Sequence, residues 1–221
     1  MLVADAGTWS TAYAVGLGNG QVYGDNGSMT VGKIGNLSVT ALGGTSTGGK
    51  ATDSINEWSD AVIARAQAQT AAYGLDNEST GSLTTKDIET LTVTATAGTA
   101  TGGTATSTLA STMLETMANV TASSDAYGLS NASLGSITTG NIGSLTVTAT
   151  GGKATGGAAT SADATANNYA DADAEARAYG LLIVSKGAIT TGNINGLKVT
   201  ATAGVAALSP IATTPAASAS A

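Results

Sequence analysis

One segment of this chain occurs four times at nearly constant spacing, and this repetition constrains the fold more than any other feature. The clearest copy, GSITTGNIGSLTVTATGGKATGG, runs from Gly135 to Gly157. A period of this length is typical of repeat arrays, in which each unit buries its apolar face against the next. The first glycine and the central leucine recur with separations of 54, 54 and 52 residues, at Gly27, Gly81, Gly135 and Gly187 and at Leu37, Leu91, Leu145 and Leu197.

The composition predicts thin, closely packed layers rather than one large core. The 221 residues are 42% hydrophobic but only 4% aromatic, with no phenylalanine. Alanine, glycine, threonine and serine dominate, which favours close approach of the backbone. The net charge of −7 is modest for this apolar content, so we expect an ordered chain.

Several classes of function are disfavoured by what the sequence lacks. Without histidine or cysteine, the chain cannot form a Ser-His-Asp or Cys-His catalytic centre, a thiolate zinc site or an imidazole metal site. Its eight basic residues are scattered, which argues against a nucleic-acid partner. No apolar run is long enough for a membrane span, and the first residues do not form a signal peptide.

We therefore expect no catalytic residues, no metal and no cofactor, and we expect that the protein is not an enzyme. Cleavage of a polysaccharide by paired carboxylates is the one chemistry that the residue types leave open. No acid pair recurs in the repeats, which argues against it.

Each copy of the repeat contains a segment whose alternation predicts a β-strand. In SLTVTAT, Leu145, Val147 and Ala149 alternate with threonines, giving one apolar face and one threonine face. A shorter β-favouring run, SITTGNI, precedes it and contains the turn dipeptide Gly140-Asn141. Each unit is thus predicted to open with two short strands. The equivalent apolar residues are Leu37, Val39 and Ala41, then Leu91, Val93 and Ala95, and finally Leu197, Val199 and Ala201.

The segments between these strands are predicted to be helices over 54–75, 107–127 and 161–179. A Ser-x-x-Glu capping box begins the first of them at Ser54. All three end in Tyr-Gly-Leu, which is typical of a glycine C-cap. The helical stripe of the first consists of Ile55, Trp58, Val62, Ala66, Gln69 and Tyr73, and the other two helices end at Tyr127 and Tyr179.

These elements predict an α+β repeat protein, a solenoid-like array of about four two-strand β units alternating with Ala-rich helices. The alternative is a mainly β-solenoid or a trimeric β-roll. The predicted units are a partial N-terminal helix unit (1–22), repeat 1 (23–74), repeat 2 (75–128), repeat 3 (129–180), an incomplete repeat 4 with strands only (181–204) and a low-complexity C-terminal tail (205–221).

The two ends of the sequence are out of phase with the repeat, which suggests self-assembly. The first residues resemble the end of a helical segment, with Trp9 and Tyr13 on its stripe, and the last unit has strands without a following helix. We expect a head-to-tail homopolymer, so that the protein is a structural subunit of an extracellular filament, tube or sheath. The residues expected to pack in the repeats or at the assembly contact are Trp9, Tyr13, Trp58, Val62, Tyr73, Tyr127, Tyr179, Leu145, Val147, Leu197 and Val199.

The expected location is extracellular or at the cell surface, with copies of the chain itself as partners and no membrane span. The absence of cysteine is compatible with this location, and in general style the chain resembles the repetitive Thr-, Ala- and Gly-rich surface and appendage proteins of microbes. Five Asn-x-Ser/Thr triplets are candidate glycosylation sites, although a Ser- and Thr-rich sequence also produces them by chance. They begin at Asn26, Asn36, Asn77, Asn119 and Asn131.

The threonine face of the strands suggests a different function, that of an adhesive, fibre or ice- or glycan-binding module. Rows such as Thr92, Thr94 and Thr96 would present regularly spaced hydroxyl groups. Threonine is also simply a common strand residue, and the predicted helices would separate the threonine strands of successive units.

Two further motifs are assigned structural roles. The acids of DADAE (Asp171, Asp173 and Glu175) suggest a calcium loop but lack its central glycine and terminal glutamate, so we expect a solvated helix face. The Gly-Gly pairs lack the spacing of a phosphate-binding loop, and we expect turns there.

Overall fold

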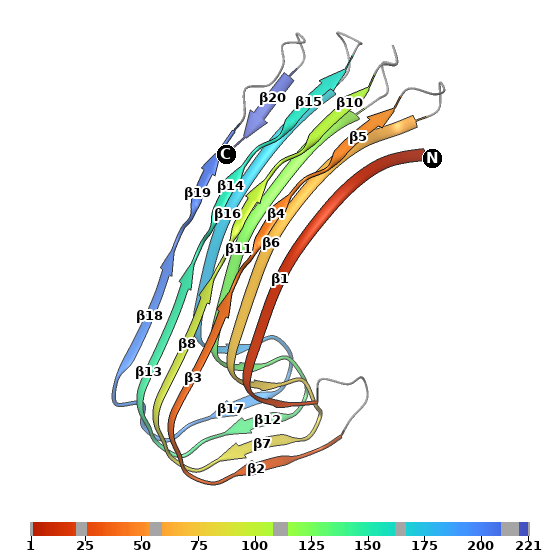
Figure 1. Ribbon diagram of the computed structural model, residues 1–221. Helices are drawn as coiled ribbons and strands as arrows, with labels where there is room; N and C mark the ends of the chain where they lie inside the picture. The colour runs from red at the N-terminus through yellow and green to blue at the C-terminus, as the bar shows by residue number, and fades with distance from the viewer. Residues whose placement is uncertain are drawn as a thin grey trace.

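The chain is built from β-strands that stack in parallel, coil upon coil (Figure 1). The computed structural model describes residues 2–20, 26–53, 59–107, 115–161, 167–208 and 217–220. All regular secondary structure in these ranges is β-strand, and the strands stack coil on coil, so the protein is a β-solenoid. The same ranges hold no helix of the length and apolarity that a membrane crossing requires.

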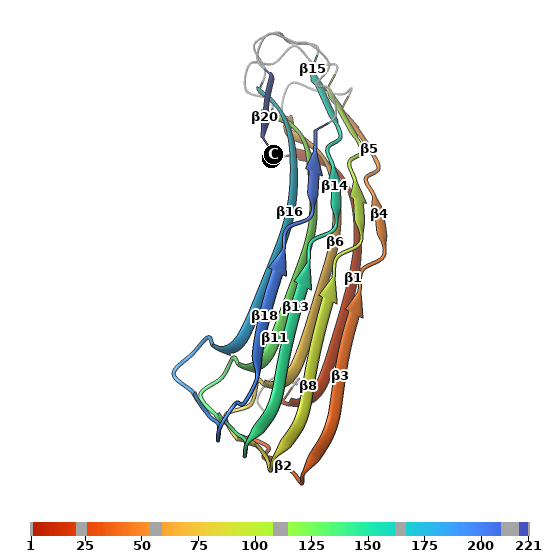
Figure 2. The same ribbon diagram turned by 90° about the vertical axis from the view of Figure 1, so that its left-hand side faces the viewer.

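One coil consists of a long strand, a short strand at the bend and a return path of three segments. In the second coil, β6 (Ser59–Asn77) is the long strand and β7 (Ser82–Thr85) lies at the bend. The return path consists of β8 (Ile88–Thr96), β9 (Thr99–Thr101) and β10 (Thr104–Ser107). The long strand thus faces the three return segments across a thin interior (Figure 2).

The other coils repeat this order of elements. The first coil contains β1 (Leu2–Asn19), β2 (Met29–Val31), β3 (Ile34–Leu42), β4 (Thr45–Thr47) and β5 (Lys50–Asp53). The third contains β11 (Glu115–Asn131), β12 (Ser136–Thr138), β13 (Ile142–Thr150), β14 (Lys153–Thr155) and β15 (Ala158–Ser161). The fourth contains β16 (Asn167–Ile183), β17 (Ala188–Thr190), β18 (Leu197–Thr202) and β19 (Val205–Ala207), and β20 (Ala217–Ser220) pairs with β16.

Equivalent residues of neighbouring coils lie beside each other in these sheets. Leu91 pairs with Leu37 on one side and with Leu145 on the other, and Leu145 pairs with Leu197. The sequence period of 54, 54 and 52 residues is therefore the length of one coil. Because neighbouring strands lie about 4.8 Å apart, each type of residue recurs at that spacing along the coil axis.

Small apolar side chains fill the interior, and they become smaller along each return path. Leu91, Val93 and Ala95 of β8 are fully buried, followed by Ala100 in β9 and Ala105 in β10. Alanines of the long strands meet them from the other side, so the two layers approach closely without large side chains. Those that are fully buried are Ala64, Ala66, Ala68, Ala72, Ala118, Ala122 and Ala126.

The prediction of helices over 54–75, 107–127 and 161–179, and with it the α+β class, is wrong. Their described residues form strands, chiefly β6, β11 and β16, and the supposed helical end at the N-terminus is β1. Buried residues of β6 alternate with less buried ones from Ala64 to Ala72, a period of two that only a strand produces. The helix propensity of alanine and the spacing of the larger side chains favoured a helix. These segments form strands instead, because in-register pairing with neighbouring coils outweighs that propensity. The residues of the proposed capping box, and Trp58, lie outside the described ranges.

The repeated Tyr-Gly-Leu motif changes the phase of a strand rather than ending a helix. Ala72 and Leu75 are both fully buried although three positions separate them, so the alternation shifts between them. A Cβ atom at Gly74 would lie 2.5 Å from the carbonyl oxygen of Gly128 and 2.9 Å from Cγ2 of Val93. Only glycine fits where the long strand bends against the next coil and the return path.

The glycine-containing breaks of the return path provide a test of the stacking. A Cβ atom at Gly98 would lie 1.8 Å from the carbonyl oxygen of Gly44 in the preceding coil, whereas one at Gly32 would meet nothing within 4 Å. Gly98→Ala should therefore lower the free energy of unfolding by about 1–3 kcal/mol, because neighbouring coils must separate. Gly32→Ala, the matched control, should change it by less than about 0.5 kcal/mol. Urea denaturation measures both, and equal stability of the two variants would contradict the close stacking.

Candidate functional site

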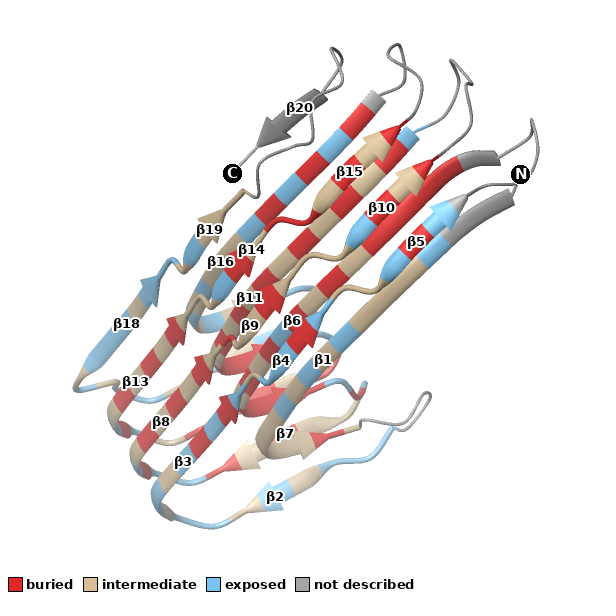
Figure 3. Ribbon diagram, turned by 45° about the horizontal axis from the view of Figure 1, so that its top comes forward, coloured by how far each residue is buried: buried red, intermediate tan, exposed pale blue. Residues whose placement is uncertain are grey.

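The outward side of the return path presents threonine columns. We call this surface, made of the outward residues of β3–β5, β8–β10, β13–β15 and β18–β19, the threonine face. Buried residues alternate along its strands with half-buried ones, as the colours of β8 and β13 show in Figure 3. One column is threonine in every coil, and most of its neighbours are largely threonine. The uniform column consists of Thr40, Thr94, Thr148 and Thr200.

The threonines of this face are available to an external partner. Among the residues that the structure describes, the hydroxyls of Thr92, Thr94, Thr146 and Thr148 make no hydrogen bond to the protein. The face carries almost no charge and no aromatic ring. Its charged outward residues are Lys50, Lys153, Lys198 and, near one end of β8, Glu89, which forms an ion pair with Lys33.

The geometry of the sheets sets the spacing of these hydroxyls in two directions. Within a column, equivalent residues of successive coils lie about 4.8 Å apart. Along a strand, successive outward residues lie about 6.6–6.8 Å apart. Each hydroxyl can donate one hydrogen bond and accept two. Over β8 and β13 the face is therefore a two-dimensional lattice of small donor and acceptor groups, whereas the exposed Leu42 and Val205 interrupt it on the first and last coils.

The outward face of the long sheet has a different character, with aromatic and charged side chains. Tyr13, Tyr73, Tyr127 and Tyr179 form a column with ring centroids 5.2, 4.6 and 5.3 Å apart, in which the first pair is tilted by 47° and the other two pairs are stacked. Burial raises the pKa of the Tyr73 and Tyr127 hydroxyls far above the usual value for tyrosine. Both rings thus stay neutral, and the column stabilises the stacking of coils.

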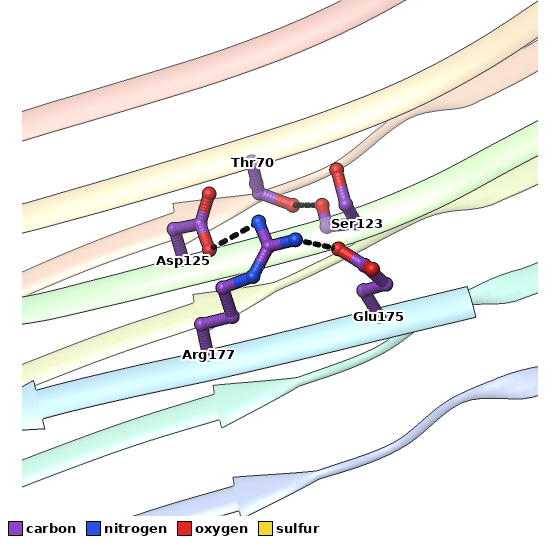
Figure 4. Close-up of polar contacts among 5 residues, drawn as sticks. All are labelled: Thr70, Ser123, Asp125, Glu175 and Arg177. Carbon is purple, nitrogen blue, oxygen red and sulfur yellow. Dashed lines mark hydrogen bonds and ion pairs between the residues drawn. The ribbon is translucent and has the colours of Figure 1, made fainter. Parts of the chain in front are cut away.

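Figure 4 shows a cluster of polar side chains, in which Asp125 and Arg177 lie two positions before Tyr127 and Tyr179 of the tyrosine column. Arg177 forms ion pairs with Glu175 of its own strand and, at 3.7 Å, with Asp125 of the preceding coil. Burial raises the pKa of Asp125, and the Arg177 guanidinium opposes this shift. Glu175 raises the pKa of Arg177. We call Thr70, Ser123, Asp125, Glu175 and Arg177 the Arg177 cluster, and it borders a shallow depression of about 280 Å³.

A third set of polar residues, an asparagine ladder, lies inside the bend. Asn19 donates to Oδ1 of Asn77 at 2.9 Å, and Asn77 donates to Oδ1 of Asn131 at 3.1 Å. Asn131 donates onward to the carbonyl oxygens of Gly135 and Ala188. Such in-register ladders satisfy buried amides from coil to coil.

The five candidate glycosylation residues lie in different environments. Asn77 and Asn131 belong to the asparagine ladder and are fully buried. Asn26 and Asn36 are exposed and Asn119 is half-buried, and glycosylation of these three stays a prediction.

The predicted packing residues fall into two groups. Val62, Leu145 and Val147 are fully buried, and Tyr73 and Tyr127 are half-buried in their column. The others that the structure describes, namely Trp9, Tyr13, Tyr179, Leu197 and Val199, are exposed on the first and last coils.

The acids of DADAE are strand residues, so their expected arrangement on a helix is wrong. Asp171, Asp173 and Glu175 alternate along β16 and therefore share one face. Within the described ranges, the structure contains no group of three acidic, histidine or cysteine side chains that could hold a metal ion.

Comparison with known proteins assigns no identity. No protein-family model, no curated protein and no solved structure matches this chain. Evidence for the function therefore comes from the threonine face and from the outward face of the long sheet.

Sequence reasoning found the threonine face and missed the Arg177 cluster. Asp125 and Arg177 are direct partners only because β11 and β16 pair in register. The available signal was the common distance of these two residues from the repeated Tyr-Gly-Leu motif.

One buried carboxylate makes stability depend on pH. Asp76 is 2% exposed, and both of its carboxylate oxygens lack a hydrogen bond of normal geometry from the described residues. Burial raises its pKa to about 6, and the nearby hydroxyls of Ser130 and Tyr13 limit the rise. The ionised form is thus disfavoured in the folded chain.

Replacing Asp76 with asparagine should stabilise the protein at neutral pH. Because the folded pKa is raised, wild-type stability is greatest below about pH 4, falls as the pH rises to about 6 and is constant above it. Asp76→Asn removes this loss, so the free energy of unfolding should rise by up to about 3 kcal/mol at pH 7 and by much less at pH 4. Denaturation at both pH values measures the difference. The exposed Asp5→Asn is the control, and an equal effect of the two variants would contradict the burial of Asp76.

Proposed function

We propose that the protein is a non-enzymatic ice-binding module that acts through its threonine face. The observation that carries the proposal is the in-register column of Thr40, Thr94, Thr148 and Thr200, which further threonines flank on both sides in the second and third coils. These side chains repeat in two dimensions and point away from the core.

A crystalline partner suits this surface better than a single molecule does. Ice presents water molecules at fixed spacings in two dimensions, of the same order as the spacings of strands and of alternate residues. Threonine hydroxyls can take the place of waters in that lattice, and the methyl groups are stiff and apolar. The near absence of charge on the face also favours ice, since charged groups hold their own hydration shells.

The solenoid removes the sequence-based argument against this function. Predicted helices would have separated the threonine strands of successive units, but β3, β8, β13 and β18 are direct neighbours. A glycan-binding role of the same face is less well supported, because segments 34–53, 88–107, 142–161 and 197–208 contain no aromatic residue for a sugar to stack on. Head-to-tail polymerisation, a homopolymeric partner and an extracellular location stay predictions.

A bulky side chain in the uniform column tests the proposal. Thr148→Tyr places a ring at the centre of the lattice, so it should abolish or nearly abolish inhibition of ice recrystallisation and thermal hysteresis. The matched control is Thr121→Tyr, which introduces the same change in the third coil on the outward face of the long sheet. Both sites are exposed or half-buried, so stability should change by less than about 0.5 kcal/mol.

The control variant should retain the ice activity of the wild type. Absence of activity in the wild-type protein, or equal loss in both variants, would refute the assignment to the threonine face.

A further inference from the structure

We propose that the outward face of the long sheet binds a neutral polysaccharide in the depression between Trp9 and the Arg177 cluster. This site lies on the opposite side of the coil from the threonine face and does not depend on ice binding. It combines an exposed aromatic platform, a shallow depression and convergent polar groups, which together are typical of ligand sites.

Trp9 supplies the aromatic platform. Its side chain is 60% exposed, which is unusual for a tryptophan. A Cβ atom at Gly7 would lie 2.3 Å from Cη2 of Trp9, so the indole lies over the strand at Gly7. A ring that lies along the backbone in this way presents one apolar face to the solvent, and the C–H face of a sugar ring can stack on it.

The indole extends along β1 toward Gly7, and the depression begins on the other side of Trp9, at Thr11. Thr11, the next outward residue of β1, pairs with Gln69, which pairs with Ser123, and Ser123 pairs with Glu175. All four border the depression of about 280 Å³. Three strand spacings separate the first of these residues from the last, or about 14 Å, which is long enough for several sugar rings in a row.

The polar groups along this row match sugar hydroxyls. The Gln69 amide both donates and accepts hydrogen bonds, Glu175 and Asp125 accept them, and Arg177 donates from a planar fork. The ion pairs of Arg177 hold the charged groups in place, so they are organised before the ligand binds.

Charge selects among polysaccharides. Two carboxylates surround one guanidinium in the Arg177 cluster, and Asp171 and Asp173 lie farther along the same strand. The local field is therefore negative, which repels uronic-acid and sulfated polymers. A neutral chain is the ligand that this chemistry accepts.

Native affinity electrophoresis of the full chain tests this proposal. The gels contain dextran, galactomannan, mixed-linkage β-glucan or, as an anionic comparison, alginate. At least one neutral polymer should retard the protein, and alginate should not. Trp9→Ala and Gln69→Ala should each weaken binding to the retarding polymer about tenfold or more, which corresponds to loss of one stacking or hydrogen-bonding contact.

Two variants control for position. Tyr169→Ala removes another exposed aromatic residue from the same face outside the depression, and Thr148→Tyr alters the opposite face. Both should bind like the wild type, and thermal unfolding should confirm that all four variants are folded. Failure of every neutral polymer to retard the protein, retardation by alginate alone, or equal loss in Tyr169→Ala would overturn the proposal.

Discussion

The parallel pairing of equivalent residues in successive coils is the interaction on which the rest of this structure depends. It places leucine on leucine and glycine on glycine, so that each coil finds its hydrogen-bond partners in the next. The spacing leaves no room for a side chain at Gly98, which lies against Gly44 at a break of the return path. Small residues in the sequence are therefore a requirement of the stacking.

Stacking in register also places equivalent side chains of successive coils beside each other, so that they form columns. The tyrosine column lies on the outward face of the long sheet, and the asparagine ladder lies inside the bend. Each of them connects at least three coils. Asn77 can be fully buried because its neighbours above and below carry the same amide. Without that repetition, the same residue would be a buried polar group without enough partners.

The sequence predicted the coil length and the two faces of the return strands, because period and alternation are local patterns. It did not predict the long strands correctly. Their alanines are compatible with a helix as well as with a thin sheet. Only pairing between neighbouring coils, such as that of Ala64 with Ala118, distinguishes the two. The Arg177 cluster could not be predicted for a related reason, since Asp125 and Arg177 lie in different coils and meet only once the register is known.

The two outward faces differ in how strictly they follow the repeat, and this difference separates their functions. On the threonine face Thr40, Thr94, Thr148 and Thr200 are identical, which suits a partner that is itself periodic. On the long sheet the column that begins at Trp9 continues as Gln67, Thr121 and Asp173. The stacking of coils requires neither the uniform threonine column nor the varied column, because the side chains of both point away from the core. A column that varies from coil to coil instead builds one distinct site, which suits a discrete ligand.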